Sequence, residues 1–176
     1  MAAGTRSERT AWVLNLDADL ELASRRYAPS AAVRAAMAPR VATLAASLLG
    51  PDDVLVSDDD PPRSAAGLVG RAFCPTPRAI ALLVRVGARP APHPGVEILR
   101  EVNGRAFAAS LGPTLPGAVF ARDADVALRA LDARPSVAAQ WRVKRAFGMA
   151  GRGQRPIAPG AATDADRAFL RKAIAA

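Results

Sequence analysis

One lysine and the glycine-rich segment that follows it are the residues best suited to chemistry in this chain. Of the 24 basic residues 22 are arginine, and the two lysines are Lys144 and Lys172. Lys144 ends a short apolar run and precedes a loop with glycines at 148, 151 and 153. A lysine ammonium contacts a phosphate oxygen as a point charge, and the exposed N–H groups of a glycine loop bind phosphate too. The segment therefore predicts phosphate binding, although a high-GC coding bias also explains scarce lysine and such a loop can be a solvated turn.

The order of the residues excludes three common nucleotide motifs. A Walker loop needs Gly-Lys-Ser/Thr after four variable residues, which is absent here. The dinucleotide fingerprint needs the reverse glycine spacing and a helix directly after it. In protein kinases the glycine loop comes before the strand lysine, whereas Lys144 comes first in this chain.

A lysine on a strand, then a glycine loop, then a second strand resembles the ATP-grasp superfamily. Upstream, the chain is similar to the entry helix, the following strand and the next helix of that superfamily, over residues 99–107, 111–119 and 123–131. Residues 11–90 resemble its small α/β pre-ATP-grasp domain. The resemblance covers most of the chain, and its most specific part is the segment 144–153.

The resemblance implies an ATP site. Lys144 would contact the ATP phosphates, and the loop with Gly148, Gly151, Arg152 and Gly153 would fold over them. Arg105 lies near the position of a first phosphate-binding lysine of the family. Members activate a carboxylate as an acyl phosphate and join it to an amine, which implies a ligase-like activity, but no catalytic residue is assigned here.

The family's magnesium-binding acids should lie well beyond the hairpin, and only 19 residues follow Ile157. We therefore expect the ATP-binding front portion of the fold without its metal-binding half, so that Mg²⁺ joins ATP only if a downstream segment supplies ligands. Such a chain would not be catalytically complete, because phosphoryl transfer depends on metal-assisted charge stabilisation.

The composition of the chain bears on other possible functions, from nucleic-acid binding to metal binding. Hydrophobic residues make up 51% of the chain, so a packed core is expected. The net charge of +8 invites nucleic-acid binding, but the arginines are scattered and few aromatic residues could stack on bases. With one cysteine, Cys74, and one histidine, His93, no disulfide or metal-ligand set is predicted. We expect no membrane span and no secretory signal, and hence a cytoplasmic protein.

The elements that must position these residues form two predicted domains. Strands at 11–16 and 54–56 flank a helix that Ser30 opens and Gly50-Pro51 ends, which predicts a parallel βαβ unit in a Rossmann-like domain over 11–90. Thr76 caps a further helix with Pro77 early in it. Residues 88–95 contain three prolines and predict an extended connector.

The second predicted domain, 95–176, is a partial α+β ATP-grasp subdomain. It contains a helix over 96–111, a strand over 118–120, a helix over 123–131 that Asp123 begins, and a last helix over 164–175 that Thr163 caps. Strands over 141–144 and 154–157 are predicted to form an antiparallel hairpin. The acids at 17, 19 and 58–60 are interpreted as caps and turn residues, and Trp12 and Trp141 as core anchors.

Three hypotheses of function follow. The first is an ATP-binding, ligase-like ATP-grasp portion whose partner is a nucleotide. The second is a non-catalytic, self-associating interaction module, since a homo-oligomer or a missing C-terminal half could cover the fold. The third and least favoured is an arginine-rich nucleic-acid binder.

Overall fold

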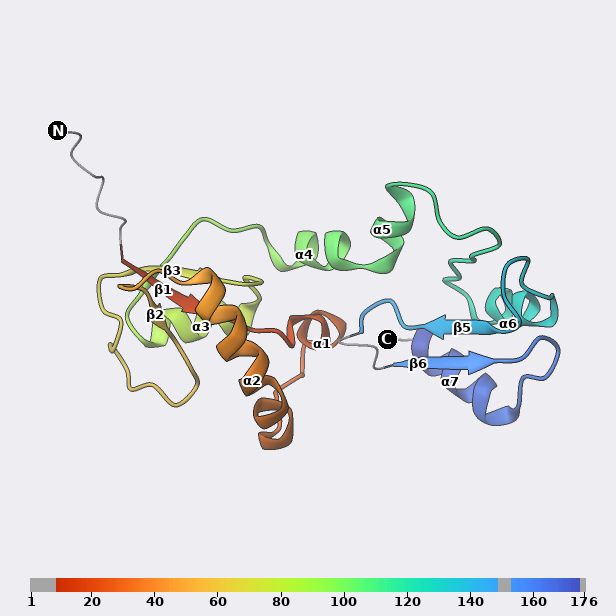
Figure 1. Cartoon of the computed structure of the whole chain (residues 1–176), viewed down its shortest axis with the longest axis horizontal. Helices are drawn as coiled ribbons and strands as arrows, with labels where there is room; N and C mark the ends of the chain where they lie inside the picture. The colour runs from red at the N-terminus through yellow and green to blue at the C-terminus, as the bar shows by residue number, and fades with distance from the viewer. Residues whose placement is uncertain (1–8, 149–152, 175–176) are drawn as a thin grey trace. The chain divides into compact units, whose positions relative to one another are not determined.

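The computed structural model describes residues 9–148 and 153–174, which form two compact units (Figure 1). Unit 1 takes the described part of Met1–Ala18 together with Tyr27–Val96. Unit 2 takes Asp19–Arg26 together with the described part of Glu97–Ala176. The chain is therefore a mixed α/β protein with one parallel sheet in unit 1 and a separate antiparallel pair of strands in unit 2.

The sheet of unit 1 has four parallel strands in the order β2-β1-β3-β4. They are β1 (Thr10–Val13), β2 (Val54–Leu55), β3 (Val69–Ala72) and β4 (Arg89–Pro90). The parallel pairing of the first two predicted strands is confirmed, although β1 ends at Val13, earlier than predicted. The connector predicted over 88–95 is wrong at its start, because Arg89 and Pro90 pair with β3. Proline is accepted there because β4 lies at the edge of the sheet.

Two helices follow strands in unit 1, and their caps explain where they begin. In α2 (Ala31–Leu48) the Ser30 hydroxyl accepts a hydrogen bond from the Val33 N–H. In α3 (Pro77–Arg85) the Thr76 hydroxyl accepts one from the Ala79 N–H, and Pro77 is the first helical residue. The predicted cap Thr76 is confirmed, and Ser30, which was predicted only to open the helical stretch, also acts as a cap, since a cap oxygen binds an N–H group that the first turn leaves without a partner.

The core of unit 1 lies between α3 and the sheet. It contains small aliphatic side chains, as the alanine-rich composition predicts, and its buried members are Ala11, Val13, Val56, Ala65, Ala79, Leu82, Leu83, Val86 and Ala88. Gly70 in β3 permits the close packing, because a Cβ there would lie 3.1 Å from both Cδ atoms of Leu83. Cys74 is also buried.

The helices of unit 2 differ from the prediction at one glycine. The helix predicted over 96–111 is wrong as one element, because it divides into α4 (Val96–Asn103) and α5 (Arg105–Ser110). Gly104 between them has an extended backbone, with φ −71° and ψ 142°. A Cβ at Gly104 would meet the Arg100 carbonyl oxygen at 3.0 Å, so glycine suits this break. A short helix that the sequence analysis did not predict, α1 (Ala18–Ala23), also contributes to this unit.

The strand predicted over 118–120 is wrong, because these residues have no regular secondary structure. Their side chains are exposed, and none of the strands within residues 9–148 and 153–174 supplies backbone partners. A short apolar run does not form a strand without a sheet to join. None of the described helices is long and apolar enough to cross a membrane.

The predicted hairpin is confirmed at its predicted bounds. β5 (Trp141–Lys144) and β6 (Gln154–Ile157) pair antiparallel and lie beside α6 (Ala124–Asp132) and α7 (Asp164–Ile174) (Figure 1). Their common core contains Leu131, Ile157 and Leu170. Asp123 caps α6 through its carboxylate, and Thr163 caps α7, both as predicted. This packing fixes the hairpin, since two strands alone are marginal in water.

Candidate functional site

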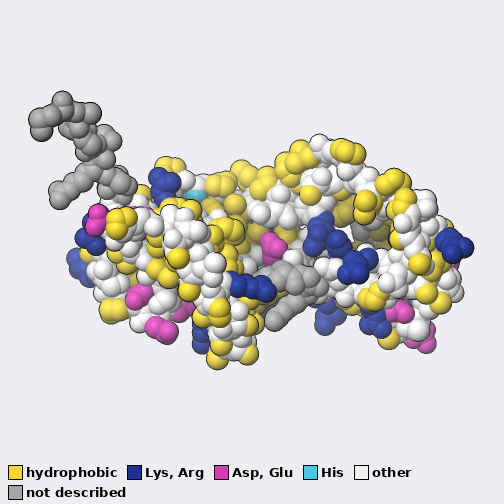
Figure 2. All heavy atoms as spheres, viewed as in Figure 1, with side chains coloured by type: hydrophobic (Ala, Val, Ile, Leu, Met, Phe, Trp, Pro, Cys, Tyr) yellow, Lys and Arg dark blue, Asp and Glu magenta, His cyan; other side chains and the backbone are white. Residues whose placement is uncertain are grey.

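The two faces of the hairpin differ in their side chains: one is apolar and the other is positively charged. Alternation along β5 turns Trp141 and Val143 toward the core with α6 and α7. The residues between them, Arg142 and Lys144, are exposed and lie on the opposite face. Lys144 is the cross-strand partner of Gln154. The end of β5 therefore presents positive charge on a face that the core does not use, and Figure 2 shows Lys and Arg side chains gathered there.

Lys144 has no partner among the residues that the structure describes. It makes no ion pair with a carboxylate and no side-chain hydrogen bond within 9–148 or 153–174. Its neighbour on the same face, Arg142, contacts the Gln154 side-chain oxygen at 3.4 Å, which is a weak interaction. An exposed ammonium that no described carboxylate neutralises is available to an external anion.

Arg105 lies directly beside the residues that follow Lys144. Its backbone N–H donates to the Ala146 carbonyl at 3.2 Å, and its Nε donates to the Arg145 carbonyl at 2.8 Å. The structure thus ties one predicted site residue, Arg105, to the residue that follows another, Lys144, while no contact within the described ranges joins their two side chains. The start of α5 is held against the end of β5 by the same two bonds.

The base of the glycine loop is also held. The Arg145 N–H donates to the Gly153 carbonyl at 3.3 Å, which closes the loop on the β6 side. Gly153 has φ +71°, a conformation that side chains rarely adopt, and a Cβ there would lie 3.2 Å from the Arg145 Cδ. Gly148 is described and half-buried at the other end of the loop. Gly151 and Arg152, also predicted site residues, lie outside the described residues.

Two arginines of the basic cluster around the glycine loop support the hairpin from its core side. The guanidinium groups of Arg145 and Arg155 lie 5.5 and 5.9 Å from the centre of the Phe169 ring. Arg155 also pairs with the carboxylate of Asp166 in α7. Hydrogen bonds from Thr163 hold the pKa of the Asp166 carboxyl below its ordinary value, and Arg155 adds to this effect. Arg155 is therefore engaged by a carboxylate of the fold, in contrast with Lys144, whereas Arg145 lies over the Phe169 ring and its buried Nε has no hydrogen-bond partner among the described residues.

Asp19 is a further charged group of unit 2 near the predicted site. It lies in the first turn of α1. Burial raises the pKa of the Asp19 carboxyl above its ordinary value, and the positive charge of Arg105 partly opposes this rise. The sequence interpretation of Asp19 as a cap residue did not predict that it lies in the field of Arg105, because 86 residues separate the two.

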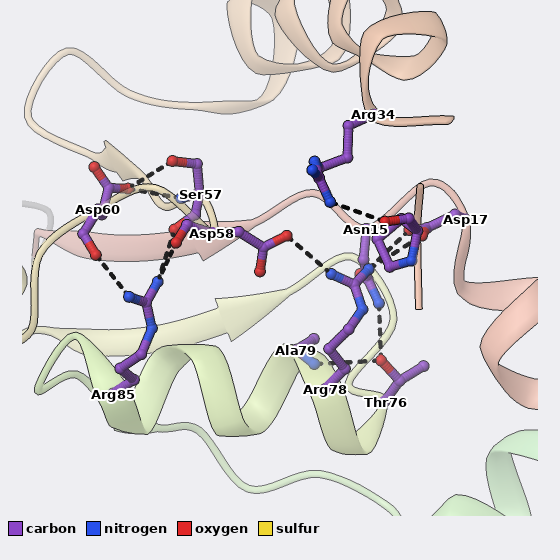
Figure 3. A network of polar contacts seen from close by, with 11 residues as sticks. Asn15, Asp17, Arg34, Ser57, Asp58, Asp60, Thr76, Arg78, Ala79 and Arg85 are labelled. Carbon is purple, nitrogen blue, oxygen red and sulfur yellow. Dashed lines mark hydrogen bonds and ion pairs between the residues drawn. The ribbon is translucent and has the colours of Figure 1, made fainter. Parts of the chain in front are cut away.

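A second polar group lies in unit 1, at the carboxyl ends of the strands (Figure 3). Arg78 Nη2 donates to both carboxylate oxygens of Asp17 at 3.1 Å, and its Nη1 contacts Asp58 at 3.4 Å. The buried Asn15 side chain donates to the Cys74 carbonyl and the Thr76 hydroxyl, at 2.8 and 3.1 Å. These groups satisfy one another, so the network holds the loops at this edge of the sheet together.

Two hollows that described residues form lie in unit 1. One borders α2 around Pro39 and Leu44, and the other borders Trp12 and Arg71. No group of three or more His, Cys, Asp and Glu side chains within the described ranges could hold a metal ion. The residues present do not fit the Mg²⁺ that the family resemblance implies, and no step is derived through it.

Comparisons of the chain with protein-family models, with curated proteins and with solved structures find no match. The function of this chain is therefore argued from its residues and their geometry.

Proposed function

We propose that this chain binds ATP through the outer face of the β5–β6 hairpin, as the front portion of an ATP-grasp-like, ligase-like protein. In this proposal unit 1 corresponds to the pre-ATP-grasp domain and unit 2 to the partial ATP-grasp subdomain. The observation that carries the proposal is the Lys144 ammonium, exposed and unpaired among the described residues at the mouth of a glycine loop.

The charge around Lys144 suits a polyphosphate. The Arg105 Nε donates a hydrogen bond to the Arg145 carbonyl, while the Arg105 Nη groups make no hydrogen bond to any residue in the described ranges. That bond fixes the direction of the guanidinium, whose remaining N–H groups suit phosphate oxygens geometrically. The Lys144 ammonium and the Arg105 guanidinium both belong to the region at the end of β5. Two cations in one region suit the several charges of a triphosphate better than the single charge of an isolated anion.

The backbone of the loop adds to this argument. The strands on both sides of the loop are fixed by pairing with each other and by packing on α6 and α7. Glycines at 148, 151 and 153 let the backbone between them approach a ligand closely, because no Cβ is in the way. Backbone N–H groups in such a segment form concavities that bind anions. The loop would thus close over phosphates that Lys144 holds.

The proposal is for binding, not for a complete reaction. The described carboxylates form no metal-holding group, and phosphoryl transfer needs its developing charge neutralised. The chain's own contribution is to hold the phosphate tail with Lys144 and Arg105.

Calorimetric titration with ATP tests the proposal. We expect the wild-type chain to bind ATP and the Lys144→Ala variant to bind it about tenfold more weakly, since a charge-assisted hydrogen bond is lost. Lys172→Ala is the matched control, because it removes the other lysine, which lies in the last turn of α7. No binding by the wild type, or equal binding by wild type and Lys144→Ala, would overturn the proposal.

Self-association is the second candidate function, and one observation favours it. The segment between α5 and α6 exposes large apolar side chains, with Leu111 70% and Leu115 76% accessible to solvent. Val119 and Phe120 continue this exposed set. Contiguous exposed apolar surface commonly marks an interaction site. Sedimentation velocity tests it: a monomer at all concentrations, unchanged by Leu115→Glu, would exclude the self-associating module.

A further inference from the structure

The parallel sheet of unit 1 has one face that α3 does not cover. Alternation along β3 turns Gly70 and Ala72 toward the core with α3, so Val69 and Arg71 belong to the other face. The register of the sheet places Arg89 of β4 beside Val69, and therefore on the face of Arg71. These two arginines are the only charged residues in the four strands that the structure describes in this sheet.

The part of this face next to β4 is open to solvent. Arg71 and Arg89 are both exposed, and neither pairs with a carboxylate of the described residues. Phe73 follows Arg71 by two positions, and its N–H continues the ladder by donating to the Val13 carbonyl at 2.8 Å. The alternation therefore puts Phe73 on the same face, where it is 55% exposed. We call Arg71, Phe73 and Arg89 the arginine face.

The two guanidinium groups lie within reach of neighbouring groups of one ligand. Strand spacing and rise set the Cα atoms of Arg71 and Arg89 about 8 Å apart, which two long side chains can span. The Arg71 guanidinium lies 5.9 Å from the centre of the Trp12 ring, and this contact helps to orient it. His93, an exposed residue after β4, borders the same hollow as Arg71. No acidic residue lines this hollow, so the charge on this side of the sheet is positive.

An exposed aromatic ring beside two arginines suits a chain that has both flat apolar groups and regular negative charges. The bases of a single strand stack on aromatic rings and on guanidinium planes, and aromatic residues on a sheet face bind them in this way. Arginine also binds phosphate oxygens through its paired N–H groups. A duplex keeps its base faces inside the stack, and an acidic peptide has charge without flat groups. The residues present therefore favour a single-stranded nucleic acid.

We propose that the arginine face binds single-stranded nucleic acid, with a base stacked on Phe73 and neighbouring phosphates on Arg71 and Arg89. The net charge of +8 adds a sequence-independent attraction for the strand. No basic run marks this face in the sequence, because 18 positions separate the two arginines and only the register of the sheet brings them together. The face lies within unit 1 and does not depend on the ATP site proposed in unit 2.

Fluorescence anisotropy with a labelled 12-nucleotide oligouridylate tests the proposal, and at about 50 mM salt we expect a Kd of about 10 μM. Phe73→Leu, which keeps an apolar side chain and removes the ring, should weaken binding about tenfold, whereas Phe73→Tyr should retain it. Arg71→Gln and Arg89→Gln should each weaken binding about fivefold. Each should also reduce the slope of log K against log salt by about 0.7, since one phosphate contact is lost.

Three controls separate this face from non-specific attraction. Arg40→Gln removes an exposed arginine of α2 outside the face and should leave the affinity nearly unchanged. A 12-base-pair duplex, and a polyglutamate of equal charge, should each compete at least about tenfold more weakly than the unlabelled oligouridylate. Equal competition by either one, unchanged affinity in Phe73→Leu, or a loss in Arg40→Gln as large as that in Arg71→Gln would overturn the proposal.

Discussion

Two arginines on α3 of unit 1 and two cations on the outer face of the hairpin in unit 2 are used in opposite ways. In unit 1 Arg78 binds the Asp17 carboxylate, and Arg85 donates to the carbonyls of Ser57, Asp58 and Asp60 (Figure 3). Both lie on α3 and fix the chain that follows β2. In unit 2 Lys144 and Arg142 extend from the outer face of β5, and neither pairs with a carboxylate in the described ranges.

This difference shows why a net charge of +8 says little about partners by itself. Part of that charge is used inside the fold, to hold loops at the carboxyl edge of the sheet. The charge that can bind a ligand is the part that no carboxylate or carbonyl of the chain has already engaged. The contrast predicts that substitutions of Arg78 or Arg85 lower the stability of the fold. Substitutions of Lys144 or Arg142 should instead weaken the binding of a ligand.

Arg78→Ala should have the largest effect on stability. It leaves the carboxylate of Asp17, which is 6% exposed, without its bidentate partner. We expect the free energy of unfolding to fall by about 2–3 kcal/mol, somewhat less than for a fully buried pair because Arg78 is a quarter exposed. Urea denaturation measures it.

A matched control and a double variant sharpen this prediction. Arg89→Ala removes an exposed arginine of the same unit and should change stability by no more than about 0.5 kcal/mol. Adding Asp17→Asn to Arg78→Ala should recover part of the loss, because the uncompensated charge is removed. Equal stability of Arg78→Ala and Arg89→Ala would refute the contrast drawn for unit 1.

Gly153→Ala should have an intermediate effect. The alanine would hold a φ of +71° at the base of the loop and bring its Cβ to 3.2 Å from the Arg145 Cδ. A left-handed conformation costs a side chain about 1–2 kcal/mol, and we expect a loss of stability of that size in thermal or urea unfolding. Gly95→Ala, whose Cβ would meet nothing within 4 Å, is the control and should be close to neutral. Equal losses in the two variants would show that Gly153 is not constrained.

Lys144→Ala should have the smallest effect on stability. The side chain is exposed and makes no contact with a carboxylate of the described chain, so the free energy of unfolding should change by less than about 0.5 kcal/mol. Urea denaturation of this variant beside Arg78→Ala measures the contrast directly. A loss comparable to that of Arg78→Ala would mean that Lys144 is structural and would remove the basis for a ligand site.

The sequence predicted the elements that local signals define. The hairpin strands, the caps Thr76, Asp123 and Thr163, and the parallel pairing of β1 with β2 each follow from a short pattern of residue types. β3 was not predicted, because Val69-Gly70-Arg71-Ala72 has no apolar run and becomes a strand by pairing with β1. The strand predicted over 118–120 has such a run and finds no partner.

The sequence likewise predicted only the part of the candidate site whose residues are close together in the chain. Lys144 and the glycines are neighbours in the chain, so the sequence could place them in one hairpin. The bond between Arg105 and the Arg145 carbonyl joins residues 40 positions apart, and the resemblance to a family suggested the position but not the contact. The pairing of Asp17 with Arg78, across 61 positions, was beyond local patterns altogether.

The most direct test of the account compares ATP with AMP on the wild-type chain and on Lys144→Ala, by calorimetric titration at constant salt. If Lys144 and its loop hold the phosphate tail, the wild type binds ATP at least about tenfold more tightly than AMP, and most of this difference disappears in the variant. An equal preference for ATP in both proteins, or no binding of ATP by the wild type, would contradict it.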